Sequence, residues 1–588
     1  MPPYPLAGYV PSSRRMQAFS VIYSRKLVRF AVFWLVLLTA CGAFADDSKI
    51  SPDLKPLLSN PSSNINVIVQ YNTPPQQSSG GGGLLGGLVG AVVNLLGGVL
   101  HVVFSLIPAV SATLHPSDII SVSNQSNVSY ISLDRPVAAS QDYAEAAVNA
   151  PVAWTSGFDG TGIGIAVIDS GIYAHPDLNA ANSSHSRVVY RQSFVGGSLL
   201  DDFGHGTHVA GIAAGNGASS SKPGSFYTIK GVAPNANLID LRVLDLNGAS
   251  SDSVVIAAIQ QAVQLKSKYN IRVINLSLGR PIYESCSRDP LCQAVEAAWK
   301  SGIVVVTAAG NLGRNGYGTV LAPGNSPHAI TVGAMKTEDT PHRNDDLIAS
   351  YSSRGPAQFD LTAKPDVVAP GNLMDSLLAP GSTLVKQYPA NIVATSEYTT
   401  STAPAGQLYF RLSGTSMATP VVSGAVALML DKDPSLTPDN VKARIMKTAT
   451  KTFPVSSTAQ DPVTGKYYTD FYDMFTVGAG YLDISAALAN YDRVYGSAAS
   501  PQVLYNSTLG IATLVPNTAA TWWISSIWTP SLVWGTTVLK PGPAGSSAIW
   551  GSNGSWGTNG SWGTNGSWGT NGSWGTNGSW GTDTNGEK

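Results

Sequence analysis

The feature that most limits the fold of this chain is a series of short apolar runs after Asp142, each closed by small residues and followed by a helical pattern. The runs cover residues 163–168, 238–243, 273–278, 303–307 and 329–332. Strands that alternate with helices predict an α/β fold with a central parallel sheet and helices on both faces. Because active sites in such sheets lie at the carboxyl ends of the strands, the residues after each run are candidates for chemistry.

Asp169 and His205 are the first two candidates. Asp169 ends the first run in I-A-V-I-D-S-G-I, where a buried carboxylate needs a cation or donors to stay charged, although an isolated Asp-Ser-Gly can also be a turn. His205 lies between two glycines in D-D-F-G-H-G-T-H-V-A-G, and these glycines leave space around its ring. His208 follows three residues later, but no Glu or Cys stands at the accompanying ligand spacing, so we do not expect a metal pair.

Ser416 and Asn311 complete the set of candidates. Ser416 follows a Gly-Thr turn at the start of an apolar helix, where unpaired backbone N–H groups favour negative charge on an attached oxygen. Ser416 could be a simple N-cap, but Thr415 or Ser413 could cap the helix equally well. Asn311 ends the run I-V-V-V-T-A-A-G-N, where its amide can donate to an oxyanion or form a turn.

The motifs D-S-G-I, H-G-T-H-V-A-G and G-T-S-M-A-T-P resemble those of the subtilisin-like serine proteases over about residues 142–492, and the order Asp169, His205, Ser416 is the order of that family. The resemblance implies that Ser416 attacks the scissile carbonyl, that His205 moves the proton and that Asp169 orients the imidazole. It also implies an oxyanion hole formed by the Asn311 amide and the Ser416 backbone N–H.

The same resemblance implies a substrate-binding strand and a main specificity pocket. The residues involved are Ser277, Leu278, Gly279, Ala308, Ala309, Gly310 and Leu321. Leu321, in the turn before A-P-G-N-S-P, is aligned near the pocket floor, where bacterial subtilisins have Gly. A leucine there predicts a shallow apolar pocket that accepts Ala, Val or Leu better than Phe or Tyr.

Calcium and the cysteines mark departures from the family pattern. Residues 217–227 lack the Asn-rich loop that supplies the tight calcium site of bacterial subtilisins, and Asp177 in H-P-D-L matches a calcium ligand but does not make a site alone. The chemistry requires no cofactor, and structural calcium stays open. Cys286 and Cys292 flank an insertion after Gly279. If the protein is exported, we expect a disulfide between them, with free thiols as the alternative.

The N-terminal 140 residues predict two processing segments. Residues 1–45 have the order of a signal peptide, with basic residues, an apolar run over 30–40 and small residues before Asp46. The sequence L-T-A-C-G around Cys41 resembles a bacterial lipobox, so a lipid anchor at Cys41 is the alternative. Residues 46–140 are interpreted as a small α+β inhibitory propeptide.

Within this propeptide, residues 65–71 alternate as a strand and residues 119–133 indicate one or two further strands. An apolar Gly-rich insert, residues 80–110, is expected to supply the helices. A membrane-associating or disordered insert is the alternative, although Leu84–Val110 lacks the basic flanks of a membrane span.

Beyond the catalytic domain, predicted as residues 141–493, the chain continues as an extension over 494–549 and a tail over 550–588. The tail repeats W-G-T-N-G-S, a unit with one aromatic residue that cannot bury a core unaided. The net charge of −1 argues against a nucleic-acid partner.

The sequence therefore predicts a secreted or cell-surface serine endopeptidase, made as a self-processing zymogen and acting as a monomer on protein or peptide substrates, with its own propeptide as a partner. One rival is a surface adhesion protein that uses the Trp repeats on polysaccharide or the cell envelope, with the protease domain only processing itself. A second rival is a membrane-spanning protease, which would depend on residues 84–110.

Overall fold

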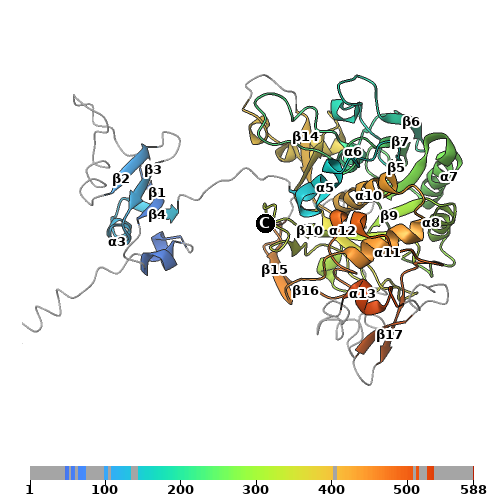
Figure 1. Cartoon of the computed structure of the whole chain (residues 1–588). Helices are drawn as coiled ribbons and strands as arrows, with labels where there is room; N and C mark the ends of the chain where they lie inside the picture. Colours follow the sequence, from blue (N-terminus) through green and yellow to red (C-terminus); the bar gives the residue numbers. More distant parts are fainter. Residues whose placement is uncertain are drawn as a thin grey trace, which may run out of the picture. The chain divides into compact units, whose positions relative to one another are not determined.

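The computed structural model describes residues 47–51, 54–59, 64–73, 98–103, 108–133, 143–400, 407–506, 511–515, 526–535 and 587 (Figure 1). The chain divides into two compact units, residues 1–138 and 139–588. The predicted signal peptide with Cys41, residues 80–97 of the insert and residues 550–586 of the repeat tail lie outside the described residues.

The smaller unit is an antiparallel sheet with one helix and two short 3₁₀ turns. The sheet has the order β2-β3-β1-β4, formed by Val99–Val103, Ala109–Leu114, Ile65–Tyr71 and Val128–Leu133. The helix α3 spans Pro116–Ser123, and the turns η1 and η2 span Asp47–Lys49 and Lys55–Ser59. Its buried residues form a hydrophobic cluster of their own, which includes Leu54, Val67 and Ile131.

Two predictions for this unit need correction. A strand predicted within residues 119–133 is present as β4, but it begins only at Val128. Residues 119–133 do not form strands alone, because Ile119 lies in α3, which begins at Pro116 and is capped by the His115 side chain. Proline at the first helical position favours this start, and Ile119 and Val122 then share one buried face. The described part of the apolar insert forms the strands β2 and β3 instead of helices. No helix in the described part of the chain is long and apolar enough to cross a membrane.

The larger unit is built on a sheet with the order β11-β10-β9-β8-β5-β7-β6, in which β12 also pairs with β10. All of these pairings are parallel except that of β10 with β11. The strands are β5 Gly164–Asp169, β6 Val188–Ser193, β7 Asn237–Arg242, β8 Ile271–Leu276, β9 Val304–Ala308, β10 Ile330–Lys336, β11 Leu347–Ile348 and β12 Val367–Pro370. The five apolar runs of the sequence are therefore confirmed as strands.

Helices cover both faces of this sheet and complete three layers (Figure 1). The helix α6, His205–Ala214, packs against α10, Thr415–Lys432, while α7, Asp252–Tyr269, packs against α8, Pro290–Lys300. The helix α10 is buried from Thr415 to Leu430, as expected for a helix that is apolar on every side. In α7, acidic Asp252 in the first turn and basic Lys266 and Lys268 in the last turn favour the helix dipole.

Shorter elements surround this framework. The helices are α4 Ala144–Ala147, α5 Ala150–Thr155, α9 Thr383–Gln387, α11 Pro438–Thr448, α12 Ile484–Ala489 and α13 Pro530–Trp534, and the 3₁₀ turns are η3 Pro176–Leu178, η4 Gly313–Asn315, η5 Pro389–Asn391 and η6 Thr395–Glu397. Three hairpins pair β13 Met374–Leu377 with β14 Tyr409–Leu412, β15 Ser456–Gln460 with β16 Tyr467–Phe471, and β17 Gln502–Asn506 with β18 Ile511–Val515. In the described part of the C-terminal extension, Trp528 and Trp534 belong to the main hydrophobic core.

Candidate active site

Asp169 and His205 form a buried pair at the carboxyl end of the central sheet. Asp169 is the last residue of β5 and His205 is the first residue of α6. His205 Nδ1 lies 2.7 Å from Asp169 Oδ1. Gly206 permits this approach, because a Cβ at that position would lie 3.1 Å from Asp169 Cβ and would clash with the carbonyl oxygen of Gly171. His205 Nε2 is buried and has no hydrogen-bond partner among the described residues, which leaves it available for proton transfer.

A second buried carboxylate, Asp201, fixes the start of α6 against the end of β5. Its Oδ1 accepts hydrogen bonds from Ser170 Oγ at 2.8 Å and from Gly204 N at 2.7 Å. Its Oδ2 accepts from the backbone N and the Oγ1 of Thr207, at 2.8 and 2.6 Å. Asp201 therefore positions His205 without a hydrogen bond to its ring, a role that no local sequence motif predicts.

Ser416 lies in the first turn of α10 and is tied to the segment that follows β8. Its Oγ donates to the carbonyl oxygen of Ser277 at 3.1 Å, and Ser277 Oγ donates to the carbonyl oxygen of Ser416 at 2.8 Å. The Ser416 hydroxyl is therefore not hydrogen-bonded to His205 Nε2 in this structure. Such catalytic hydrogen bonds are often open in free enzymes and form when the substrate is bound.

The side chain of Asn311 is oriented by Thr415. Asn311 follows β9, and its Oδ1 accepts from the backbone N of Thr415 at 2.9 Å and from Thr415 Oγ1 at 3.1 Å. Thr415 Oγ1 also accepts from Gly310 N at 3.1 Å. Because the amide oxygen faces Thr415, the NH₂ group faces the opposite way, and none of the described residues accepts from it. The structure thus brings an unused amide donor to the segment that carries Ser416.

Two opposing effects set the pKa of His205. Burial of the ring disfavours the imidazolium, but the charge and hydrogen bond of Asp169 and the charge of Asp201 outweigh it, so the pKa is raised above its ordinary value of 6.5. His208, in the same helix, behaves differently. Burial and the proximity of His205 lower its pKa to about 3, and its Nε2 donates to the carbonyl oxygens of Met374 and Phe410 at 3.0 and 2.9 Å. The neutral His208 ring therefore has a structural role in the core.

Leu321 lies between the two segments that the sequence analysis assigned to substrate. A Cβ on Gly310 would lie 2.7 Å from Leu321 Cγ, and a Cβ on Gly279 would lie 3.1 Å from Leu321 Cβ. The backbone supports this position, because Leu321 N donates to the carbonyl oxygen of Ala309 at 3.0 Å. The side chain of Leu321 therefore occupies space between the 277–279 and 308–310 segments.

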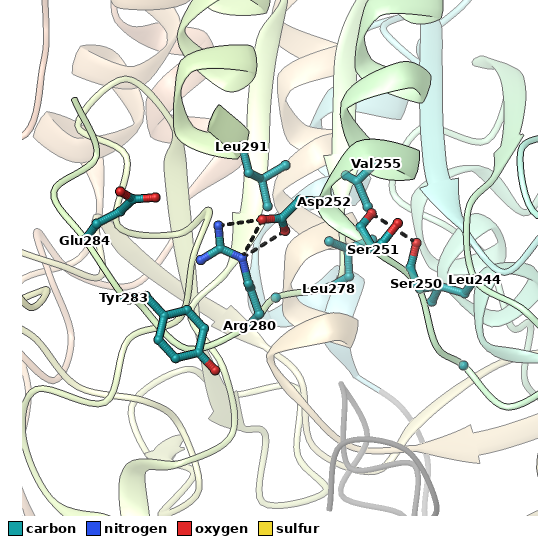
Figure 2. A pocket seen from close by; sticks show the side chains of 12 residues that line it. Leu244, Ser250, Ser251, Asp252, Val255, Leu278, Arg280, Tyr283, Glu284 and Leu291 are labelled. Carbon is teal, nitrogen blue, oxygen red and sulfur yellow. Dashed lines mark hydrogen bonds and ion pairs between the residues drawn. The ribbon is translucent and has the colours of Figure 1, made fainter. Parts of the chain in front are cut away.

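A separate pocket of about 350 Å³ opens beside Leu278 and Gly279. Its apolar lining comes from Leu244, Val255, Leu278 and Leu291. Figure 2 shows Arg280 lying between Asp252 on one side and Tyr283 and Glu284 on the other. Arg280 pairs with Asp252 and with Asp289, both at 2.8 Å. The lining also includes Glu284. Two carboxylates, of Asp252 and Glu284, and one guanidinium therefore line the pocket, which combines an apolar base with a surplus of negative charge.

The surroundings of Asp177 do not fit a calcium ion. Its Oδ1 accepts from Ser219 N at 2.7 Å and its Oδ2 accepts from the Tyr409 hydroxyl at 2.7 Å. Calcium needs six to eight oxygen ligands, whereas both oxygens of this carboxylate already face hydrogen-bond donors. Among the described residues, no group of three or more His, Cys, Asp or Glu side chains could hold a metal ion.

The buried guanidinium of Arg187 supplies a positive charge next to Asp177. It donates to the backbone carbonyl oxygens of four residues: Asp177 at 2.9 Å, Asn179 at 3.1 Å, Ala214 at 2.6 Å and Ala236 at 2.8 Å. Burial lowers the pKa of Arg187 to about 10, against the opposite effect of the charges of Asp177 and Asp159. The group therefore remains protonated at neutral pH.

The two cysteines of the larger unit, Cys286 and Cys292, are joined by a disulfide. The bridge closes the insertion that follows the 277–279 segment, and Leu291, inside the bridged loop, lines the pocket of Figure 2. Asp360 also holds this loop, because its Oδ2 accepts from Cys286 N at 2.6 Å. The insertion is therefore a fixed wall of the pocket.

Comparison with known proteins agrees with this fold and site. Residues 160–470 match the model of the subtilase family. Serine protease AprX of Bacillus subtilis (strain 168) is 39% identical over 347 residues, which are 58% of this chain and 73% of the relative. An alkaline protease of Alkalihalobacillus alcalophilus is 35% identical over 353 residues, 59% and 75% of the two chains. Subtilisin E of Bacillus subtilis (strain 168) is 34% identical over 365 residues, 61% and 80% of the two chains.

The matched region is more than half of the chain and contains the parallel sheet with the Asp169–His205 pair. The fold and the site define a serine endopeptidase of the subtilisin type. The chain belongs to the subtilase family, and its substrates are proteins.

Proposed function

We propose that this protein is an exported, self-processing endopeptidase in which Ser416, His205 and Asp169 form the catalytic triad. The observation that carries the proposal is the 2.7 Å pair of His205 Nδ1 with Asp169 Oδ1, which leaves His205 Nε2 buried without a partner among the described residues. A nitrogen kept unpaired in a buried site is suited to accept a proton from a nucleophile.

In the proposed reaction, the Ser416 hydroxyl turns from Ser277 to His205, and Oγ attacks the scissile carbonyl carbon while its proton passes to Nε2. The negative oxygen of the tetrahedral intermediate accepts hydrogen bonds from Ser416 N–H and Asn311 Nδ2. The intermediate collapses to an acyl ester on Ser416, and the leaving amine takes the proton from His205. Water then attacks the ester with the same assistance, which releases the acid and restores Ser416.

Labelling with a fluorophosphonate probe tests the proposed nucleophile. We expect the wild type to incorporate the probe and Ser416→Ala to incorporate none, while Ser413→Ala, which alters a nearby buried serine, still reacts. Because self-processing needs the same hydroxyl, Ser416→Ala should also remain a precursor with the segment over 46–140 attached. Labelling of Ser416→Ala, or its full processing in a host without other proteases, would contradict the proposal.

We further propose that two pockets beside the 277–279 segment select the substrate. Leu321 shortens the first pocket and favours Ala, Val or Leu over aromatic residues before the scissile bond. The pocket of Figure 2, with its surplus of negative charge, favours a long basic side chain at a more distant upstream position. A peptide library varied at each upstream position tests both points. Leu321→Gly should shift the first preference toward Phe and Tyr by about 10- to 200-fold, and Glu284→Gln should weaken the basic preference alone.

A further inference from the structure

The strongest unexplained feature outside the active site is the burial of Glu587, a charged residue that follows the Trp-Gly repeat. Only 1% of its surface is exposed. Its Oε1 accepts from Arg314 Nη2 at 2.8 Å, its Oε2 accepts from the backbone N of Ser350 at 2.9 Å, and Ser350 Oγ donates to the same carboxylate. A buried carboxylate is costly unless it is paired, and this one has three donors around it.

The backbone of Glu587 is bound as well as its side chain. Glu587 N donates to Asn372 Oδ1 at 2.9 Å, and Asn372 Nδ2 donates to the carbonyl oxygen of Glu587 at 2.7 Å. One side-chain amide thus contacts both polar groups of the main chain, while a guanidinium and a serine contact the carboxylate. These contacts together recognise a glutamate within a peptide rather than a free anion.

The residues that hold Glu587 belong to loops connected with the active site. Arg314 lies in η4, three residues after Asn311, and also pairs with Asp461 at 3.1 Å. Ser350 precedes Tyr351, whose carbonyl oxygen accepts from Gly313 N at 2.8 Å.

Asn372 is connected in a similar way. It follows Gly371, whose carbonyl oxygen accepts from Gly414 N at 2.8 Å, two residues before Ser416. The Tyr351 hydroxyl donates to the same Gly371 oxygen at 3.1 Å. The glutamate is therefore held by the loop that follows Asn311 and by a segment that is hydrogen-bonded to the residues before Ser416.

We infer that Arg314, Ser350 and Asn372 form a receptor site whose occupant is Glu587 of the chain's own C-terminal segment. Trp534, in α13, is packed into the core of the larger unit. The repeat therefore lies, in the sequence, between two residues that are bound to the protease unit, Trp534 and Glu587. Attachment in the same chain gives a high effective concentration, so the site is occupied without a tight intrinsic affinity.

This inference does not depend on the proposed catalytic roles and is tested by hydrogen exchange on the full-length protein. The Ser350 amide, which donates to Glu587, is the reporter. We expect Glu587→Ala to accelerate its exchange at least about tenfold, as the loss of a protecting hydrogen bond requires. Asp583→Asn is the matched control, since it removes a carboxylate four residues earlier, and it should leave the rate unchanged. An unchanged Ser350 rate in Glu587→Ala would overturn the inference.

A double-mutant comparison adds a second test. If Asn372 acts by holding Glu587, then Asn372→Ala should also accelerate Ser350 exchange, and the double variant should exchange no faster than Glu587→Ala alone. Effects that simply add would show that Asn372 acts on its own loop and would overturn the receptor site. Retained labelling of Glu587→Ala by the fluorophosphonate probe would show that the protease unit is folded in these measurements.

Discussion

Two buried groups of charges, at opposite ends of the central parallel sheet, differ in how completely they are hydrogen-bonded. At the carboxyl end, Asp169 Oδ2 and His205 Nε2 are buried without partners among the described residues. At the amino end, Asp366 comes just before β12 and is surrounded by donors. Its Oδ2 accepts from Lys364 Nζ at 2.7 Å and from Thr331 N at 2.8 Å.

The other oxygen of Asp366 is equally well paired. Oδ1 accepts from Ser500 Oγ at 2.6 Å and pairs with Lys442 Nζ at 3.1 Å. Burial lowers the pKa of both lysines, and the charges of these lysines hold the pKa of Asp366 below its usual range. The comparison teaches that the closed network of Asp366 stabilises the sheet, whereas Asp169 and His205 keep open hydrogen-bonding capacity that the proposed reaction would use.

The two histidines of α6 should respond to substitution in different ways. His205→Ala should reduce turnover per folded molecule by about 10⁶-fold, because the group that accepts the proton of Ser416 is lost. His208→Ala should leave turnover per folded molecule close to wild type, but should lower the free energy of unfolding by about 1–3 kcal/mol, because two buried carbonyl groups lose their donor. Kinetics and urea unfolding of both variants check this. Equal loss of activity in the two variants would contradict this division of roles between a catalytic and a structural histidine.

For the Asp366 cluster we predict the opposite outcome, a loss of stability without a loss of activity. Asp366→Ala leaves two buried lysines without their carboxylate and should lower the free energy of unfolding by about 3–5 kcal/mol, with kcat/KM unchanged at a temperature where the variant is folded. Glu296→Ala, which removes a partly exposed partner of Lys300, is the control and should change stability by less than about 1 kcal/mol. A large fall in kcat with unchanged unfolding would place Asp366 in the reaction.

A substitution of Asn311 tests the role of one hydrogen-bond donor at the carboxyl end of the sheet. Asn311→Ala should lower kcat by about 100- to 1,000-fold with little change in KM, because its NH₂ group is needed only when charge develops on the substrate oxygen. Steady-state kinetics with a fixed peptide substrate measures both constants. A raised KM with normal kcat would indicate a substrate-binding or structural role.

The smallest expected effect concerns pH. His205 must be neutral to accept a proton, and its raised pKa means that neutrality is lost at a higher pH than for an ordinary histidine. The acid limb of kcat/KM should therefore have its midpoint above 6.5, with activity falling about tenfold per pH unit below it. Asp201→Asn removes a charge that raises this pKa and should move the midpoint down. A midpoint that stays in place would exclude that electrostatic contribution.

Much of the fold could be predicted because buried parallel strands are continuous apolar runs. The strand β6, V-V-Y-R-Q-S, was missed because it lies at the sheet edge and carries polar, partly exposed residues. Residues 119–123 were misread because the apolar pair Ile119–Ile120 resembles a strand, whereas Pro116 and His115 decide the start of a helix.

The site shows a similar limit. Asp169, His205, Ser416 and Asn311 could be predicted as site residues because each stands in a short local motif. Asp201 was overlooked because its neighbour Asp202 has the same side chain, and only the fold shows which of the two is buried. The contact of Glu587 with Asn372 joins residues 215 positions apart, and no local pattern predicts such a pair.

Arg187 has a consequence for how this protease responds to its surroundings. A bound ion stabilises a protein by an amount that depends on the free ion concentration relative to its dissociation constant, so dilution or a chelator removes the benefit. The guanidinium that the carbonyl oxygens of Asp177, Asn179, Ala214 and Ala236 surround is attached to the chain by covalent bonds. Its stabilising effect does not depend on the concentration of a free ion, and at neutral pH this part of the domain keeps its cation even when dilution or a chelator would remove a bound metal.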